Sequence, residues 1–187
     1  MRAGMTSRII LASASPRRRA LLESAGFRPD VRIPNADETW PPGPLEDGVV
    51  AIARRKLDRL GAVTDLALAA DTVVALGQEV LGKPRDAADA TRMLERLSGV
   101  EHRVITGFIV RRGERVHAEA VVSRVRFRAL SAADIARYVA TGECQDKAGA
   151  YGIQGEGGAL VAWLEGSYTN IVGLPLAEVL RALERLA

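Results

Sequence analysis

The sequence predicts an α/β chain built on a mixed, strongly twisted sheet. Three observations support this prediction: short apolar runs alternate with amphipathic helical segments, turn residues separate them, and the 187 residues contain no internal repeat or low-complexity stretch. Hydrophobic residues make up 48% of the chain and charged residues 26%, which is ordinary for a globular protein with a sizeable core. The length fits a single domain over residues 1–187, or one compact fold with two lobes.

The N-terminal part of the chain alternates strand and helix. Residues 8–12 form an apolar run that predicts a buried strand. The next helix begins after Ser15, whose hydroxyl can cap it, and closes at Gly26. A loop rich in proline and acidic residues at 33–44 then leads to a second helix over about residues 45–60.

The middle of the chain predicts two hairpins separated by a helix. Residues 66–86 form a long apolar strand that turns at residues 77–78. Asp86 caps a helix that ends at residues 98–99, and residues 103–130 alternate like two long strands of a hairpin.

The C-terminal part ends in strand and helix. Ser131 and Asp134 have the spacing of a capping box at a helix start. A glycine-rich loop follows at residues 146–158, then a strand at residues 159–164 and a last helix from about Pro175.

Composition excludes several classes of protein. No apolar run reaches the roughly 18 residues of a membrane span, and the N-terminus is too poorly patterned for a signal peptide. Cys144 is the only cysteine, which excludes a disulfide framework and agrees with a reducing cytoplasm. A net charge of +3 and 4% aromatic residues disfavour a nucleic-acid polymer as partner. His102 and His117 lie in strand-like segments and receive no role, so any metal would be a hard ion with oxygen ligands.

The turn at residues 13–19 joins a helix start to three consecutive arginines, Arg17 to Arg19. A helix N-terminus carries partial positive charge, so three cations there should cost stability. The same free N–H groups and guanidinium forks are suited to a phosphate. Two interpretations remain open: a phosphate-binding turn, and a capped helix whose arginines point into solvent.

Asp71 interrupts an apolar strand, where an unpaired carboxylate would cost several kcal/mol. Such a carboxylate normally has a metal, a cation or hydrogen bonds around it. The alternative is that the strand ends at Ala70 and that Asp71 caps a turn. Lys83 follows the same hairpin and is restricted by Pro84, so the pair suggests a site for a metal and a polyphosphate.

The loop at residues 146–158 contains five glycines between residues 149 and 158, which permit close approach of the backbone to a ligand. A flexible connector is the alternative. Asp146, Lys147 and Gln154 are candidate substrate contacts. The amide of Gln154 offers a donor beside an acceptor, which complements the N3–H and carbonyl edge of uracil or thymine. Because an amide can flip, selectivity would require neighbours that hold it.

Four segments together resemble the Maf family of nucleoside triphosphate pyrophosphatases. They are "LASASPRRRALL", "AADTVVALGQEVLGKPRD", "YVATGECQDKAGAYGIQG" and "GSYTNIVGLPL", which occur in order from about residue 9 to the C-terminus. The resemblance implies a Maf/Ham1 (ITPase-like) α/β fold, with helices flanking a mixed sheet and a central cleft between two lobes. It also implies a homodimer and hydrolysis of a nucleoside triphosphate to monophosphate and pyrophosphate with Mg²⁺ or Mn²⁺.

The segments "SPRR" and "DKAGAYGIQG" are similar to the branch of the family that acts on dTTP and UTP. Transferred to matching positions, the family's roles make Asp71 the proton acceptor, with Glu38 as a carboxylate beside the metal. We expect Asp71 to act mainly as the base and to contact the metal through water. The remaining implied roles are substrate choice for Arg17, Thr72 and Gln154, and phosphate contacts for Ser13, Arg18, Lys56 and Lys83.

Two departures from the family pattern stand out. Cys144 occupies a position where proline is common, which bears on how the chain enters the glycine-rich loop. Residues 1–7 form an N-terminal extension without an assigned role.

Three alternatives remain beside hydrolysis of dTTP and UTP. The first is the same chemistry on 7-methyl-GTP or another modified nucleotide. The second is a regulator of cell division that binds nucleotides without hydrolysing them. The third is a nucleic-acid-binding module, which the scattered charge disfavours.

Overall fold

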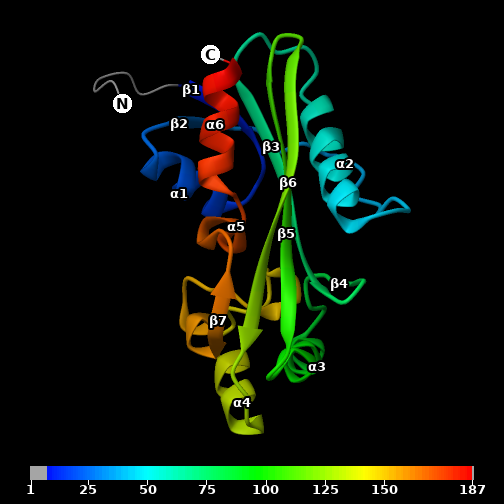
Figure 1. Ribbon diagram of the computed structural model, residues 1–187, viewed down its shortest axis with the longest axis vertical. Helices are drawn as coiled ribbons and strands as arrows, with labels where there is room; N and C mark the ends of the chain where they lie inside the picture. The colour runs from blue at the N-terminus through cyan, green and yellow to red at the C-terminus, as the bar shows by residue number, and fades with distance from the viewer. Residues whose placement is uncertain (1–7, 187) are drawn as a thin grey trace. The chain divides into compact units, whose positions relative to one another are not determined.

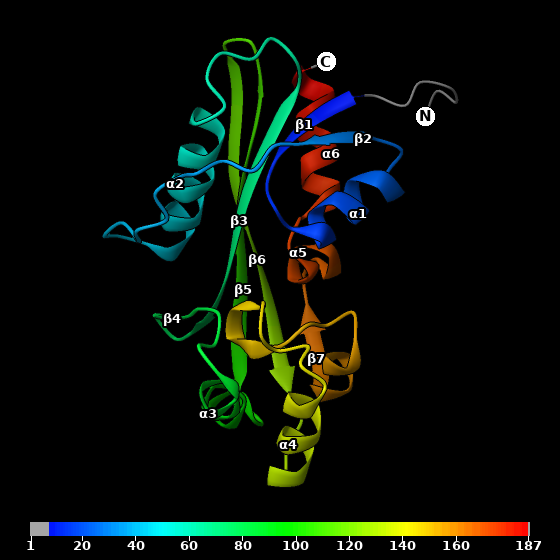
Figure 2. The ribbon, with the colours of Figure 1, turned by 180° about the vertical axis from the view of Figure 1, so that it is seen from behind.

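The computed structural model describes residues 8–186, so the expected N-terminal extension lies outside the described residues. Figures 1 and 2 show a mixed α/β arrangement of helices and strands. Seven strands form one sheet in the order β2-β1-β3-β5-β6-β7, with β4 paired to β3. The strands are β1 (Arg8–Ala12), β2 (Arg28–Val31), β3 (Ala67–Leu76), β4 (Glu79–Leu81), β5 (Glu101–Arg112), β6 (Arg115–Phe127) and β7 (Val161–Glu165). The α-helices are α1 (Pro16–Ser24), α2 (Leu45–Asp58), α3 (Ala87–Leu97), α4 (Ala132–Ala140), α5 (Tyr168–Val172) and α6 (Leu176–Leu186).

Contacts divide the chain into two compact units. The first unit comprises the chain up to Asp71, with residues 106–121 and from 173 onward, and the second comprises residues 72–105 and 122–172. Strands β3, β5 and β6 each have residues in both units. In β3 the first unit ends at Asp71 and the second begins at Thr72.

The first unit has helices on both faces of its strands. β1 pairs in parallel with β2 and with β3, and alternate residues of β1 enter different cores. Ile9 and Leu11 pack with α1 and α6, whereas Ile10 and Ala12 pack with α2. Both faces of β1 are therefore buried, which explains why its sequence is continuously apolar rather than alternating.

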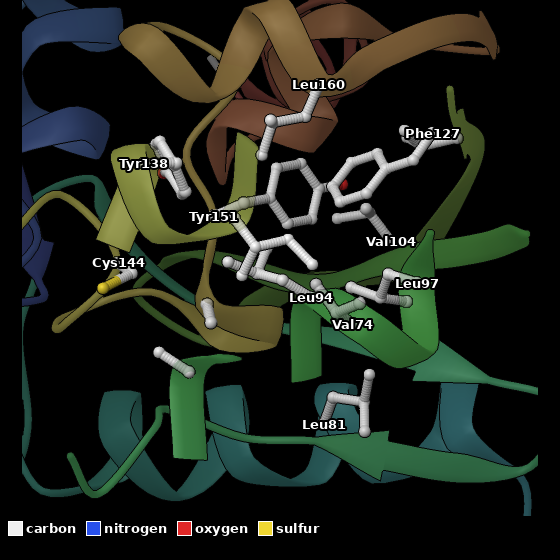
Figure 3. Packing of buried hydrophobic residues seen from close by; sticks show 14 residues of the cluster. Val74, Leu81, Leu94, Leu97, Val104, Phe127, Tyr138, Cys144, Tyr151 and Leu160 are labelled. Carbon is white, nitrogen blue, oxygen red and sulfur yellow. The ribbon is translucent and has the colours of Figure 1, made fainter. Parts of the chain in front are cut away.

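The second unit packs α3, α4 and the glycine-rich segment against the far halves of the long strands. Its core contains Leu94, Phe127, Tyr138 and Tyr151, shown in Figure 3. Tyr151 and Phe127 meet edge to face, with ring centroids 4.8 Å apart. The glycine-rich segment is thus part of a packed core, and it contains two short 3₁₀ turns, at Ala148–Ala150 and Glu156–Leu160.

The local start signals are confirmed. Ser15 accepts a hydrogen bond from the backbone N–H of Arg18, and Asp86 does the same for Asp89. Ser131 and Asp134 form a reciprocal capping box at the start of α4.

Two elements were not predicted. β2 is a four-residue edge strand that contains Pro29, and its residues are half-buried or exposed, so it has no apolar run to reveal it. α5 has only five residues, too few for a helical period. The strand predicted at residues 159–164 begins later, at Val161, because residues 156–160 form a 3₁₀ turn.

Candidate active site

The first unit brings together the arginine turn and the carboxylate of β3. Arg18 is buried, and its pKa is lowered by that burial. The carboxylates of Asp71 and Glu38 act against this shift, and the charge of Arg17 adds to it. These groups therefore lie close enough to interact electrostatically, as a shared polyphosphate and metal site would require.

Arg18 is held by protein groups on two sides. Its Nε donates to the carbonyl of Gly173 at 2.8 Å, and one terminal nitrogen donates to Ser13 Oγ at 3.0 Å. Ser13 is itself buried and accepts a hydrogen bond from the backbone N–H of Ser15. Arg18 thus fixes the turn that precedes α1, which is a structural task beyond the phosphate contact expected of it.

The three arginines of α1 have different environments. Arg17 is half-buried, whereas Arg19 is exposed and pairs with Glu23 one turn further along the helix at 2.7 Å. The N-terminus of α1 therefore carries one cation bonded within the protein, one half-buried beside it and one directed into solvent. This arrangement resolves the apparent excess of positive charge at a helix start.

Lys56 lies between the two carboxylates. Its Nζ is 2.7 Å from Asp71 Oδ1 and 2.9 Å from Glu38 Oε1. The Lys56 and Asp71 side chains are 10% and 15% exposed, so this pair is largely withdrawn from water, while Glu38 is 63% exposed. Asp71 continues β3 rather than capping a turn, which decides between the two interpretations of its position.

The donor set fits a hard divalent cation. Within residues 8–186 no group of three or more His, Cys, Asp or Glu side chains could hold a metal ion. Glu38 and Asp71 nevertheless direct oxygen atoms toward one cationic centre, the ammonium of Lys56. Two carboxylates with additional oxygen from substrate phosphates and water form the kind of ligand set that Mg²⁺ uses.

The second unit contains Thr72, Lys83 and the glycine-rich segment. Thr72 is half-buried and Lys83 is exposed after β4. The backbone N–H of Gly149 donates to the carbonyl of Gly82 at 3.0 Å, which places the glycine-rich segment directly beside Lys83. An added Cβ at Gly149 would lie 2.9 Å from Val74, so glycine is needed for this close approach.

Lys147 has partners within its own segment. Its Nζ lies 2.6 Å from Asp146 Oδ1 and donates to the carbonyl of Glu143, also at 2.6 Å. A Cβ at Gly152 would lie 2.5 Å from the Lys147 side chain, so the lysine stem packs on that glycine. Gln154, the residue predicted to contact the base, is exposed.

Sequence analysis missed the residues that hold this segment. The Tyr138 hydroxyl accepts the backbone N–H of Gly152 at 3.0 Å, and burial raises the pKa of Tyr138 to about 12. His102 is buried, and its Nε2 lies 2.9 Å from the Tyr151 hydroxyl. Burial lowers the pKa of His102 to about 4, so its ring is neutral near pH 7. The only sequence signal for Tyr138 and His102 was that each lies in or beside a run of apolar residues.

Cys144 is a free thiol buried in the core of the second unit (Figure 3). It occupies the entrance to the glycine-rich segment as an apolar packing residue.

Comparison with known proteins identifies the family of the chain. Residues 8–186 match the family described as Maf-like protein. A dTTP/UTP pyrophosphatase of Anaeromyxobacter sp. (strain Fw109-5) is 54% identical over 187 residues, covering 97% of this chain and 90% of the relative. A dTTP/UTP pyrophosphatase of Citrifermentans bemidjiense is 50% identical over 184 residues, covering 95% and 94%.

A solved structure shares the fold. The HAM1 protein from Coxiella burnetii superposes with a TM-score of 0.52 at 17% identity, covering 96% of this chain and 99% of that one. The expected Ham1-type α/β fold is therefore confirmed. In the described part of the chain, no helix is both long and apolar enough to cross a membrane.

Proposed function

The chain belongs to the Maf family, and we propose that it hydrolyses dTTP and UTP to the nucleoside monophosphate and pyrophosphate. Relatives at about half identity over nearly the whole chain are named dTTP/UTP pyrophosphatases. The observation that carries the proposal is the ion pair of Asp71 and Lys56 within reach of Arg18 and Glu38. A non-hydrolysing sensor of nucleotides would not need a carboxylate held in this way.

The chemistry follows from the charges of the first unit. Ser13, Arg18 and Lys56 contact phosphate oxygens beside the N-terminus of α1, and the bond between Arg18 and Ser13 also keeps the turn in shape. Arg17 contributes to substrate choice. Lys56 engages Asp71 Oδ1, which orients the carboxylate and leaves Oδ2 to accept a proton from the attacking water. A divalent cation held by Glu38 and, through water, by Asp71 would neutralise charge that develops on the phosphates.

For residues of the second unit we propose base selection and a further phosphate contact. Lys83 supplies a cation to the outer phosphates, and Asp146, Lys147 and Thr72 belong to the same binding set. Gln154 hydrogen-bonds the N3–H and carbonyl edge that uracil and thymine share. Guanine also offers an N–H donor beside a carbonyl acceptor, so the preference for dTTP and UTP over 7-methyl-GTP rests on the relatives, which are named dTTP/UTP pyrophosphatases.

The proposal extends to assembly and location. We place the protein in the cytoplasm as a homodimer, with a nucleotide as its small-molecule partner. The buried free thiol of Cys144 suits a reducing compartment. Light scattering of the purified chain measures the mass of the assembly directly.

The variant D71N tests the base. Pyrophosphate release from UTP should fall by about a hundredfold or more, because positioned proton transfer contributes about 10²–10⁴-fold. D65N is a matched control, since Asp65 is exposed just before the same strand, and it should keep wild-type activity. Near-normal release by folded D71N would reject this assignment.

A further inference from the structure

The carboxylate of Glu143 lies against the backbone of the glycine-rich segment immediately after Gln154. Its Oε1 accepts the backbone N–H of Glu156 at 3.2 Å. A Cβ added at Gly155 would lie 2.3 Å from Oε1 and 2.4 Å from Oε2, so only glycine allows the carboxylate this position. Oε2 is buried and has no hydrogen-bond partner among the described residues.

Glu143 is itself firmly placed. Its backbone N–H donates to Thr141 Oγ1 at 3.1 Å, and its carbonyl accepts from Lys147 Nζ at 2.6 Å. The next residue, Cys144, is buried in the core of the second unit. The carboxylate is thus presented from a fixed backbone, so it can impose a position on the segment that it contacts.

Two outside contacts bracket Gln154. Tyr138 holds Gly152, two residues before it, and Glu143 holds Glu156, two residues after it. Gly152 and Gly155 lie on either side of Gln154 in this stretch, and each gives the backbone conformational freedom. Gln154 is exposed, so its backbone position determines where its amide meets a base.

Selection of a base by a glutamine amide depends on that position. Uracil offers an N3–H donor and an O4 acceptor, whereas cytosine offers an N3 acceptor and an exocyclic amine. A rotated amide matches cytosine as well as the original one matches uracil. Discrimination therefore requires a fixed segment, because an amide that is free to move and rotate satisfies both bases.

We propose that Glu143 is a positioning residue for base selection, which fixes the backbone after Gln154 and thereby maintains a preference for UTP over CTP. The proposal rests on the proposed function, because it concerns the base-selecting residues of the same site. The carboxylate acts as a hydrogen-bond acceptor and packing surface, so its negative charge is not the property that matters.

The test compares E143A, E143Q and the control E156Q, with kcat/KM measured for UTP and CTP. E143A removes the acceptor, and the UTP to CTP ratio should fall about tenfold, mainly through a higher KM for UTP. E143Q keeps an acceptor of the same shape and should stay within about threefold of wild type. E156Q removes a nearby exposed charge and should leave the ratio unchanged. An unchanged ratio in E143A, or an equal fall in E143Q, overturns the proposal.

Gly155 provides a second test that leaves the glutamate in place. G155A should lower the ratio in the wild-type background, because the new methyl group displaces the carboxylate. In the E143A background the same substitution should have a much smaller effect, since no carboxylate remains to be displaced. Equal effects in both backgrounds contradict the proposal. Thermal unfolding of each variant checks that it is folded.

The outcomes separate this inference from the proposed function. Active wild-type protein whose ratio does not respond to E143A rejects only the role of Glu143. Wild-type protein that does not hydrolyse UTP rejects the proposed function, and the ratio is then taken from dissociation constants of UTP and CTP measured with EDTA. A protein that binds neither nucleotide rejects both.

Discussion

Replacement of Lys56 by methionine isolates the ion pair at the centre of the first unit. The variant K56M keeps an unbranched apolar side chain and removes the charge, so the carboxylate of Asp71 loses a partner at 2.7 Å. Removal of one partner from a buried pair costs about 3–5 kcal/mol. The Asp71 side chain keeps 15% exposure, which places the expected cost at the lower end, about 3 kcal/mol. At about 2–4 °C per kcal/mol for a chain of this size, Tm should fall by about 6–12 °C.

Thermal unfolding of K56M, R54M and the double variant K56M/D71N measures this cost. Arg54 is an exposed cation in the same helix, so R54M should change stability by less than about 0.5 kcal/mol. The double variant should be more stable than K56M, because the uncompensated charge has been removed as well. If K56M unfolds at the same temperature as R54M, or if adding D71N to K56M does not raise the unfolding temperature, the ion pair does not contribute to stability as argued.

The remaining predictions concern His102 and the arginines of α1. His102 is neutral in the fold, with its pKa lowered from 6.5 to about 4, so the unfolded chain binds an extra proton as the pH falls from about 6.5 to about 4. The free energy of unfolding should therefore fall across this window by up to about 3 kcal/mol, and H102F should lack that part of the pH dependence in denaturant titrations. A slope that H102F does not change would contradict the assignment. R17A should reduce pyrophosphate release from UTP at least about tenfold, whereas R19A should cost much less, because Arg19 is exposed and bonded to Glu23. Equal losses in R17A and R19A would show that α1 does not present its arginines selectively.

Local chemistry made most of the fold predictable. Ser15, Asp86 and Ser131 each mark a helix start through a side chain that bonds to the backbone three residues later, so a short window of sequence contains the whole signal. The predicted strand at residues 8–12 coincides with β1 because both of its faces are buried and nothing polar interrupts it. β2 was not predicted, because an edge strand needs no apolar run.

The candidate site was predictable in its residue types and less so in its contacts. Asp71 was singled out by a physical conflict, since a carboxylate within an apolar strand requires a partner. The choice of Lys56 as that partner depends on how α2 packs beside β3, which no local pattern encodes. Arg18 bonds to a carbonyl 155 residues further along the chain, and Glu143 bonds to a backbone N–H 13 residues further along. Such contacts exist only once the tertiary structure has formed.

The most direct test of the central claim is product analysis with the purified chain. UTP, dTTP, CTP, GTP and 7-methyl-GTP are each incubated with Mg²⁺ or Mn²⁺, and monophosphate and pyrophosphate are quantified. We predict UMP and dTMP with equimolar pyrophosphate, and slower turnover of the other three nucleotides. A strong preference for 7-methyl-GTP, or release of diphosphate and inorganic phosphate in place of pyrophosphate, would contradict the account.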